Sequence, residues 1–372
     1  MEGEVGCDVI SPRIICSRLV FNICMIAYLY GDLAIYCTAV AKSLRDVSCP
    51  FTAANTSQPS TTEPCWRESG LSKADVYKIY VAVFLALLGP FAYFNLTKTK
   101  YLQILTSVMR WTAFITMICL SVLRISDTSV EHGTPPVMDI STTPLVFGVS
   151  VYAFMCHHSI PSLVTPVRKS SQIPAILGAD YLLIATFYLV LCYTGIFAFP
   201  TVPDLYTLAF KPEESRGNLP LTIADYFLAL FPVFTLSTNF PIISITLANN
   251  LQTIITDYVP PARNLPPRLR RALFPTVAIL PPALVALATE DLGFLVSITG
   301  AYAGAGIQYF IPCSLVFLAR KKLNHLRREF RTELKNPLES YFRHWGFIVM
   351  IVVWSALAVG LVTANFVLKA IK

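Results

Sequence analysis

The sequence predicts an all-α polytopic membrane protein with nine transmembrane spans. Of its 372 residues, 55% are hydrophobic and only 14% are charged, and the mean hydropathy is +0.59. A water-soluble domain of this length would carry far more charge. The apolar residues also fall into runs that are long enough, as helices, to cross about 30 Å of hydrocarbon. The predicted spans are approximately 19–41, 78–95, 101–123, 144–166, 176–199, 222–250, 273–289, 292–318 and 345–368.

Positive charge predicts how these spans are oriented. The N-terminal segment and the loops on its side of the membrane carry 18 Lys and Arg, against eight on the opposite side. Since positive residues favour cytosolic loops, we expect residues 1–18 to be a cytosolic tail, residues 19–370 to be the transmembrane domain, and the C-terminus to be lumenal or extracellular. The net charge of +7 is concentrated in these loops and requires no nucleic-acid partner. We interpret the basic stretch 320–335 as an ordinary cytosolic loop rather than as a patch for acidic lipids.

The first span contains an ionisable residue close to the middle of the bilayer. Asp32, in YLYGDLAIY (28–36), lies where an unpaired charge is costly. Arg110 lies at a comparable depth in the third span, and we expect the two residues to form a structural ion pair. If Asp32 instead faces a cavity beside His157 or His158, it could carry a proton, because histidine is the side chain that titrates near neutral pH.

The loop that follows, residues 42–77, has the features of a lumenal segment. Asn55 begins an N-glycosylation sequon, Asn-Thr-Ser, which only a lumenal face could use. The same loop contains Cys49 and Cys65, which could pair as a disulfide in an oxidising compartment. Residues 1–17 mix acidic and basic side chains and lack an apolar core, so we expect no cleavable signal peptide.

The fourth span contains YAFMCHHSIP (152–161), which is poorly suited to a regular helix in lipid. Pro161 removes a backbone donor, and the adjacent side chains of His157 and His158 project about 100° apart on a helix, so that both could not easily avoid lipid. Unwound backbone is tolerated at mid-membrane where it lines a polar cavity, as in the substrate sites of secondary transporters. The alternative is a proline kink with both histidines hydrogen-bonded between helices. The other spans favour the break.

The sixth span carries a dense polar cluster in FPVFTLSTNFPIIS (231–244), between Pro232 and Pro241. Hydroxyl and amide oxygens on a helix loosened by two prolines suit a small cation or a hydrogen-bonded substrate. In the alternative, the hydroxyls bond the carbonyls of their own preceding turn. We favour the site, because four polar residues in five positions are more than local bonding needs. The four are Thr235, Ser237, Thr238 and Asn239.

The eighth span is rich in small residues, in ITGAYAGAGIQYFIP (298–312). Gly300 and Gly304 form a small-xxx-small pattern, which allows another helix backbone to approach closely. A sliding contact and static packing would give the same pattern, and we favour packing.

Motifs of enzymes and primary pumps are absent from the sequence. A zinc protease would need H-E-x-x-H, which CHHS (156–159) does not supply. A presenilin-like aspartyl protease would need G-x-G-D, but Leu29 stands in place of the first glycine. There is also no G-x-x-x-x-G-K nucleotide-binding loop. We therefore predict neither an enzyme nor a pump, and no metal or cofactor.

The segments quoted from the first, fourth, sixth and eighth spans, together with KTKYLQILTSVMRW (98–111) and FMCHHSIPSLVTPV (154–167), resemble the amino acid/auxin permease branch of the amino-acid transporter superfamily. The likeness covers about residues 20–365. It implies two inverted five-helix repeats, with substrate and ion bound where the first and sixth helices unwind. The first span here resembles the family's third helix, the fourth its sixth, and the sixth its eighth. The implied fold is therefore an incomplete inverted-repeat (five-plus-five) transporter fold.

The resemblance also assigns roles to residues. Backbone of the broken helix holds the substrate in the family, which implies Val151 to Cys156 here, and hydroxyls of the eighth helix bind an ion in related sodium-coupled carriers. With the candidates from the residue patterns, the predicted substrate-binding residues are Val151, Tyr152, Ala153, Phe154, Cys156, His157 and His158. The predicted ion-binding or coupling residues are Thr235, Ser237, Thr238, Asn239 and Asp32.

We therefore expect a secondary transporter of small amino acids, which works by alternating access and is coupled to protons or sodium, in the plasma or endolysosomal membrane. Residues 1–17 do not resemble the family's first two helices, which supply half of the site, so we also expect that this shortened chain could be inactive by itself. The alternative is a non-transporting membrane sensor or scaffold, which binds an amino acid or a partner and signals through the basic loop 320–344.

Overall fold

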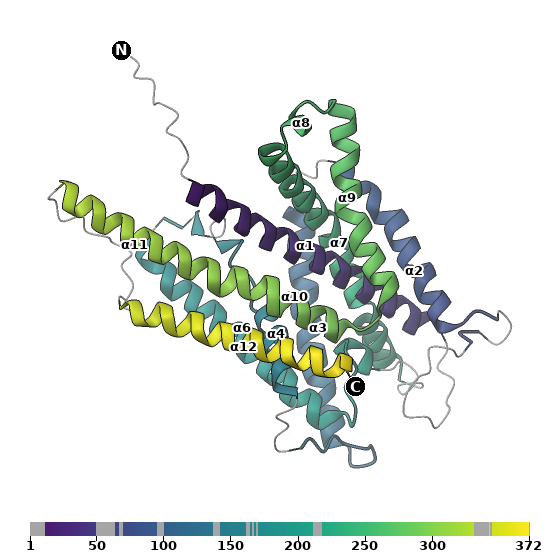
Figure 1. Cartoon of the computed structure of the whole chain (residues 1–372). Coiled ribbons are helices and arrows are strands. Elements are labelled where there is room, and N and C mark those ends of the chain that lie inside the picture. The colour runs from purple at the N-terminus through teal and green to yellow at the C-terminus, as the bar shows by residue number, and fades with distance from the viewer. Residues whose placement is uncertain are drawn as a thin grey trace.

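Helices form every regular element in the part of the chain that the structure describes (Figure 1). The structure, a computed structural model, describes residues 12–49, 64–66, 70–94, 100–136, 142–160, 164–165, 167–168, 170–210, 218–330, 342 and 344–371. The main helices are α1 (Pro12–Ser48), α2 (Lys73–Leu88), α3 (Lys100–Ser126), α4 (Thr143–Ala153), α6 (Ile173–Ala198), α7 (Leu219–Tyr258), α9 (Pro267–Ala288), α10 (Leu292–Thr299), α11 (Ile311–Phe330) and α12 (Trp345–Ile371). The shorter elements are η1 (Gly89–Tyr93), η3 (Ser170–Gln172), η4 (Tyr206–Ala209), α8 (Pro260–Arg263), η5 (Gly300–Gly304) and η6 (Gly306–Phe310). Asn55 and residues 1–11 of the predicted tail lie outside the described residues.

Within the described residues, eight helical segments are long and apolar enough to cross a membrane. They fall on eight of the nine predicted spans and confirm the prediction of an all-α polytopic membrane protein. The remaining predicted span, the fourth, contains only the 11-residue helix α4. Several helices extend beyond the approximate predicted spans. Helix α7 runs for 40 residues, and the eighth span continues as helix to His325, through basic residues.

The first span lies at the centre of the bundle. In its most apolar window 61% of the residues are buried inside the protein, against 6% for α6 and 11% for α12. Helix α1 packs against α7, α2, α9 and α10, and its buried side chains form the main core with theirs. Leu33 and Val40 of α1, Tyr77 of α2, Phe240 of α7 and Phe274 of α9 belong to this core. Helix α1 is therefore surrounded by other helices on several sides.

Helix α4 is held by direct backbone contact with α10 and η5. A Cβ atom on Gly300 would lie 1.9 Å from the carbonyl oxygen of Gly148, and a Cβ on Gly148 would lie 2.3 Å from the carbonyl oxygen of Ser297. These contacts exclude any side chain at either glycine. Gly304 lies one turn further along, against Val151 of α4. The small residues of the eighth span therefore serve packing, as the sequence analysis predicted.

Helix α10 passes into α11 through two π-helical turns, η5 and η6. The hydrogen bonds of a π turn close on the fifth residue rather than the fourth, and such turns occur frequently at functional sites. The residue pattern did not predict them. Gly306, in the second turn, lies against α1, where its Cβ would be 3.1 Å from the Sγ atom of Cys24.

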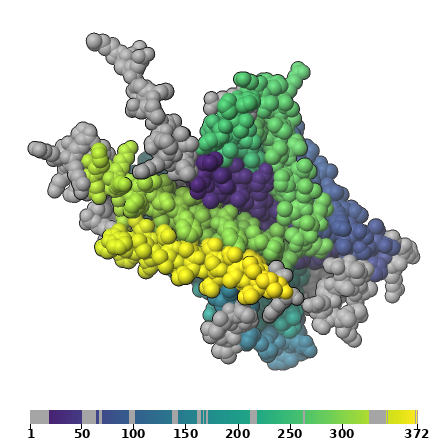
Figure 2. Space-filling view, viewed as in Figure 1, coloured from purple at the N-terminus to yellow at the C-terminus, as the bar shows by residue number. Residues whose placement is uncertain are grey.

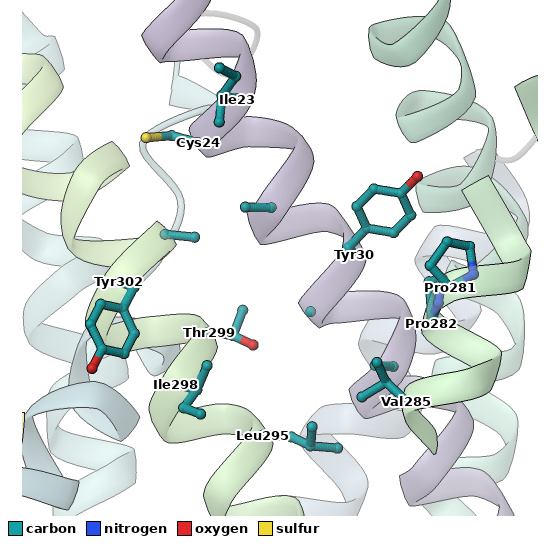
Figure 3. Close-up of a pocket in the computed structure, with 14 residues that line it drawn as sticks. Ile23, Cys24, Tyr30, Pro281, Pro282, Val285, Leu295, Ile298, Thr299 and Tyr302 are labelled. Atoms are coloured by element: carbon teal, nitrogen blue, oxygen red, sulfur yellow. The ribbon is translucent and has the colours of Figure 1, made fainter. Parts of the chain in front are cut away.

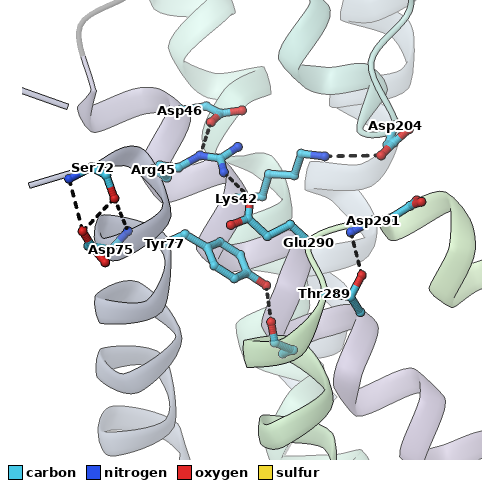
Figure 4. A network of polar contacts seen from close by, with 11 residues as sticks. Lys42, Arg45, Asp46, Ser72, Asp75, Tyr77, Asp204, Thr289, Glu290 and Asp291 are labelled. Carbon is cyan, nitrogen blue, oxygen red and sulfur yellow. Dashed lines mark hydrogen bonds and ion pairs between the residues drawn. The ribbon is translucent and has the colours of Figure 1, made fainter. Parts of the chain in front are cut away.

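A network of charged side chains surrounds the C-terminal end of α1 (Figure 4). The buried guanidinium of Arg45 pairs with Asp46 at 2.7 Å and with Glu290 at 2.5 Å, and Lys42 pairs with Asp204 at 3.3 Å. These ion pairs join α1 to the turn between α9 and α10 and to the segment after α6. Below them the Tyr77 hydroxyl donates to the carbonyl of Ala286 at 2.7 Å, which ties α2 to α9.

The chain beyond α1 is tied back to the end of that helix. Cys49 and Cys65, the pair proposed from the sequence, form a disulfide. The indole of Trp66 donates to the carbonyl of Ser48 at 3.1 Å, and the Cys65 amide donates to the carbonyl of Leu71 at 2.9 Å. The end of α1 and the start of α2 are therefore cross-linked on the predicted lumenal side.

Replacing Gly300 by alanine should destabilise the protein. The added methyl group would overlap the Gly148 carbonyl, and such overpacking costs about 1–3 kcal/mol. Thermal unfolding of the purified protein in detergent measures the effect. Gly360→Ala is the matched control, because nothing lies within 4 Å of a Cβ at this position in α12. Equal unfolding temperatures for Gly300→Ala and the wild type would show that α4 and η5 are not in contact.

Candidate functional site

The fourth span is broken where the sequence predicts it. Helix α4 ends at Ala153, with the Phe154 amide bonded to the Ser150 carbonyl, and residues 155–159 are irregular. Within the described residues, the amides of Cys156, His157 and His158 have no backbone acceptor. Pro161, which the sequence analysis made responsible for the break, lies outside the described residues. The break thus leaves backbone donors free to bind a ligand.

The last turn of α4 is bonded to the ionisable residue of the first span. The Tyr152 hydroxyl donates to Oδ1 of Asp32, the only hydrogen bond to this carboxylate in the described part of the chain. Asp32 is 5% exposed. A buried carboxylate is costly unless it is paired, so the bond from Tyr152 stabilises Asp32 at this position.

The expected ion pair between Asp32 and Arg110 is absent, which corrects the sequence analysis. The three ion pairs of the described residues are those around Lys42 and Arg45. Helix α3 packs mainly against α6 and α7 rather than against α1, and Arg110 is exposed on it. The comparable depth of the two residues, read from the sequence, did not show which helices α3 packs against. Asp32 therefore has no cationic partner in the described structure.

Aromatic rings connect the first span to the broken one. The ring of Tyr28 lies 6.1 Å from that of Tyr152 and 5.6 Å from that of His158. The Nδ1 atoms of His157 and His158 are buried, and neither has a hydrogen-bond partner in the described residues. Within the described residues, these Nδ1 atoms do not make the interhelical hydrogen bonds that the alternative interpretation requires. Two imidazoles beside free backbone amides are available to a ligand.

Helix α6 covers the other side of the break. The Cys156 Sγ atom lies 2.9 Å from the Tyr181 hydroxyl, and the Phe154 ring stacks on Tyr181 at 6.2 Å and meets Tyr188 edge-on at 5.6 Å. The unwound segment is thus enclosed between α1 and α6. Its surroundings combine a carboxylate, tyrosine hydroxyls and imidazoles with aromatic faces, which suits a small zwitterion with an apolar side chain.

Two of the predicted substrate-binding residues place their side chains away from the break. Val151 is buried against Gly304 of η5, and Ala153 is exposed on the outer side of α4. Helical geometry explains both side-chain positions, because α4 continues through Val151 and Ala153 and only one face of the helix points to the break. The other predicted substrate-binding residues are Tyr152, Phe154, Cys156, His157 and His158.

The sixth span, where the sequence predicts a cation site, is a regular helix in this structure, and the site stays a prediction. Helix α7 is continuous across both prolines, so the helix is not unwound there. The hydroxyls of Thr235 and Thr238 donate to the carbonyls of Phe231 and Thr235, each at 2.9 Å. This is the local bonding that the sequence analysis set aside.

The other two polar residues of that cluster also stay apart from the break. Ser237 and Asn239 are half-buried and have no hydrogen bond in the described residues. No hydrogen bond joins any of the four to Asp32 or to residues 154–159 within the described chain. The same part of the structure has no group of three or more His, Cys, Asp and Glu side chains that could hold a metal ion.

Sequence reasoning found Tyr152 but missed the other tyrosines beside the break, Tyr28, Tyr181 and Tyr188. Tyr28 precedes Asp32 by four residues, a spacing that places both side chains on one face of a helix and could have drawn attention to it. Tyr181 and Tyr188 have no such signal, because α6 is apolar on all sides and only the folded bundle brings these residues to the break.

A separate cavity of about 470 Å³ lies between α1, α9 and α10–η5 (Figure 3). Ala27, Gly31, Pro282, Leu295 and Thr299 are among its lining residues, and most of its surface is apolar. Ala27 and the carboxylate of the first span are five residues apart, which separates them by roughly 140° around α1. This cavity is therefore distinct from the candidate site, and its walls do not match the charges of an amino acid.

A charged thiol reagent should distinguish a hydrated cavity at the break from a dry kink. We expect Cys156 to react at least tenfold faster than Cys37, which is fully buried in α1, because such a reagent enters only where water does. Cys192 is the matched control, since it is exposed on the membrane-spanning helix α6, where the hydrocarbon of the bilayer excludes a charged reagent. Mass spectrometry of peptides from labelled proteoliposomes gives the rates. Reaction of Cys156 no faster than that of Cys192 would show that the break is dry.

Comparison with known proteins extends over nearly the whole chain. The model of the family described as transmembrane amino acid transporter protein matches residues 6–359. Transmembrane protein 104 of Homo sapiens is 44% identical over 364 residues, which cover 95% of this chain and 70% of that protein. The transmembrane protein 104 homolog of Drosophila melanogaster is 43% identical over 363 residues, with coverage of 94% and 70%. The homolog of Dictyostelium discoideum is 34% identical over 364 residues, with coverage of 94% and 68%.

Proposed function

The chain belongs to the transmembrane amino acid transporter protein family, and on this premise we propose that it is a secondary transporter of small amino acids. Transport would proceed by alternating access at the break in the fourth span. The observation that carries this proposal is the bond between Tyr152 and Asp32, because it joins a buried ionisable group directly to the edge of the unwound segment. Such segments form the substrate sites of secondary transporters.

The break supplies the groups that recognise an amino acid. The amides of Cys156, His157 and His158, which have no backbone acceptor in the described residues, would donate to the substrate carboxylate, and carbonyls of the same segment would accept from its ammonium group. The rings of Phe154 and Tyr181 would limit the size of the substrate side chain. These contacts favour small, neutral amino acids.

Asp32 is the proposed coupling residue. Among the described residues its carboxylate has one hydrogen bond and no cationic partner, so binding of a proton or a sodium ion would remove a buried charge. Neutralisation would weaken the Tyr152 bond, since a charged acceptor makes the stronger hydrogen bond. Occupancy at Asp32 would thereby change the position of the segment that holds the substrate.

Transport by proteoliposomes tests this proposal, with a panel of labelled small amino acids. We expect uptake by the wild type driven by an inward proton or sodium gradient. In the variant Asp32→Asn, gradient-driven uptake should fall at least tenfold. Counterflow should be retained, because exchange requires no net movement of the coupling ion. Asp127→Asn is the control, since Asp127 is exposed in the loop after α3.

Two results would contradict the proposal in different ways. Full gradient-driven uptake by Asp32→Asn would exclude Asp32 as the coupling residue and leave transport intact. Absence of both uptake and counterflow for all substrates, with folded protein verified, would reject transport by this chain. Binding of an amino acid without flux would then favour a membrane sensor.

Tyr152→Phe should separate the hydroxyl from the ring. The ring contact with Tyr28 remains in this variant, and the bond to Asp32 is lost. We expect gradient-driven uptake to fall more than counterflow does, because the link between ion and substrate sites is broken. Tyr193→Phe on the exposed face of α6 is the matched control. An equal fall in uptake and counterflow would indicate a role in substrate binding instead of coupling.

A further inference from the structure

Helix α11 leaves the apolar part of the bundle as a continuous helix and becomes basic within one turn. Its residues 315–318 are exposed and apolar, and they are followed directly by Arg320, Lys321 and Lys322. Both lysine side chains are exposed, and neither has an acidic partner among the described residues. The change from an apolar to a positive surface marks the depth at which the hydrocarbon of a bilayer gives way to headgroups.

Exposed aromatic residues lie beside this point. Phe342, three residues before α12, and Trp345, its first residue, are 62% and 66% exposed. The Arg320 guanidinium donates to the carbonyl of Phe342 at 2.9 Å, which holds the start of α12 next to the basic turn of α11. The two helices run side by side on the surface (Figure 2). Aromatic side chains with this exposure are typical of the membrane–water interface.

We propose that Arg320, Lys321, Lys322, Phe342 and Trp345, here called the basic interfacial patch, bind the headgroups of acidic phospholipids. The rings would enter the outer part of the bilayer, and the lysines would then lie at the depth of the lipid phosphates. Phosphate is a strong acceptor for such cations. The interpretation preferred from the sequence, an ordinary cytosolic loop, does not account for the exposed aromatic residues beside these lysines.

The patch lies on the side of the membrane that the positive charges mark as cytosolic, where acidic lipids are concentrated. A free anion would gain nothing from the exposed rings, whereas a lipid uses both the cations and the aromatic faces. The inference is independent of the transport proposal, since the patch shares no residue with the broken span.

Native mass spectrometry of the full chain in detergent tests the proposal, with titrations of phosphatidylserine and phosphatidylcholine. We expect the wild type to bind phosphatidylserine more tightly. The double variant Lys321→Ala/Lys322→Ala should bind it roughly tenfold to thirtyfold more weakly, because each lysine near the surface contributes about 1 kcal/mol and 1.4 kcal/mol is tenfold. Its unfolding temperature, compared with that of the wild type, verifies the fold.

A matched double variant tests for a general effect of net charge. Arg268→Ala/Arg271→Ala removes two exposed cations from α9, on the same predicted side of the membrane. We expect it to retain affinity for phosphatidylserine. An equal loss in both double variants, or equal binding of the two lipids by the wild type, would overturn the proposal.

The aromatic residues distinguish a lipid from a free phosphate. Phe342→Ser/Trp345→Ser should weaken phosphatidylserine binding and leave the binding of inorganic phosphate unchanged. Phosphate binding as tight as that of the lipid, with no effect of the aromatic substitutions, would show a simple anion site and contradict the proposal.

Discussion

The hydrogen bonding of backbone groups inside a bilayer constrains this molecule more than any other interaction. A helix meets this requirement by itself, but the segment after Ala153 does not, and its amides must face protein or a cavity. The structure meets the constraint by enclosing the break between α1 and α6. Such enclosure requires the remaining piece of the span, α4, to be fixed without the support of a full-length helix. The backbone contacts of Gly148 and Gly300 provide that support.

Helix α1 supplies the second element on which the arrangement depends. One face presents Asp32 and Tyr28 to the broken span, another lines the apolar cavity, and its C-terminal end is joined to three other segments by ion pairs and a disulfide. The ties are concentrated at the predicted lumenal end. The polar site thus lies on a helix whose one end is firmly positioned and whose middle is packed on several sides.

Hydropathy and charge were enough to predict the class of fold, because the length of a membrane span depends on local composition alone. The break at residues 154–159 was also predictable, since adjacent histidines conflict with a lipid-facing helix. Pairings between spans were not. Asp32 was assigned to Arg110 by depth, but it bonds Tyr152, because depth says nothing about which helices are neighbours. The hydroxyls of Thr235 and Thr238 in α7 donate to carbonyls of their own helix, so the cation site assigned to this cluster stays a prediction.

The two π turns between α10 and α11 have a consequence for how the eighth span presents its faces. Each π turn adds about one residue relative to an α-helix, and one residue corresponds to roughly 100° of rotation. The stripe of small residues that touches α4 at Gly300 is therefore not continued along the same side of α11. One continuous helix can thus turn a packing surface inward in its first half and a charged surface outward in its second. The angular offset lets the two surfaces vary independently in sequence, although they belong to the same span.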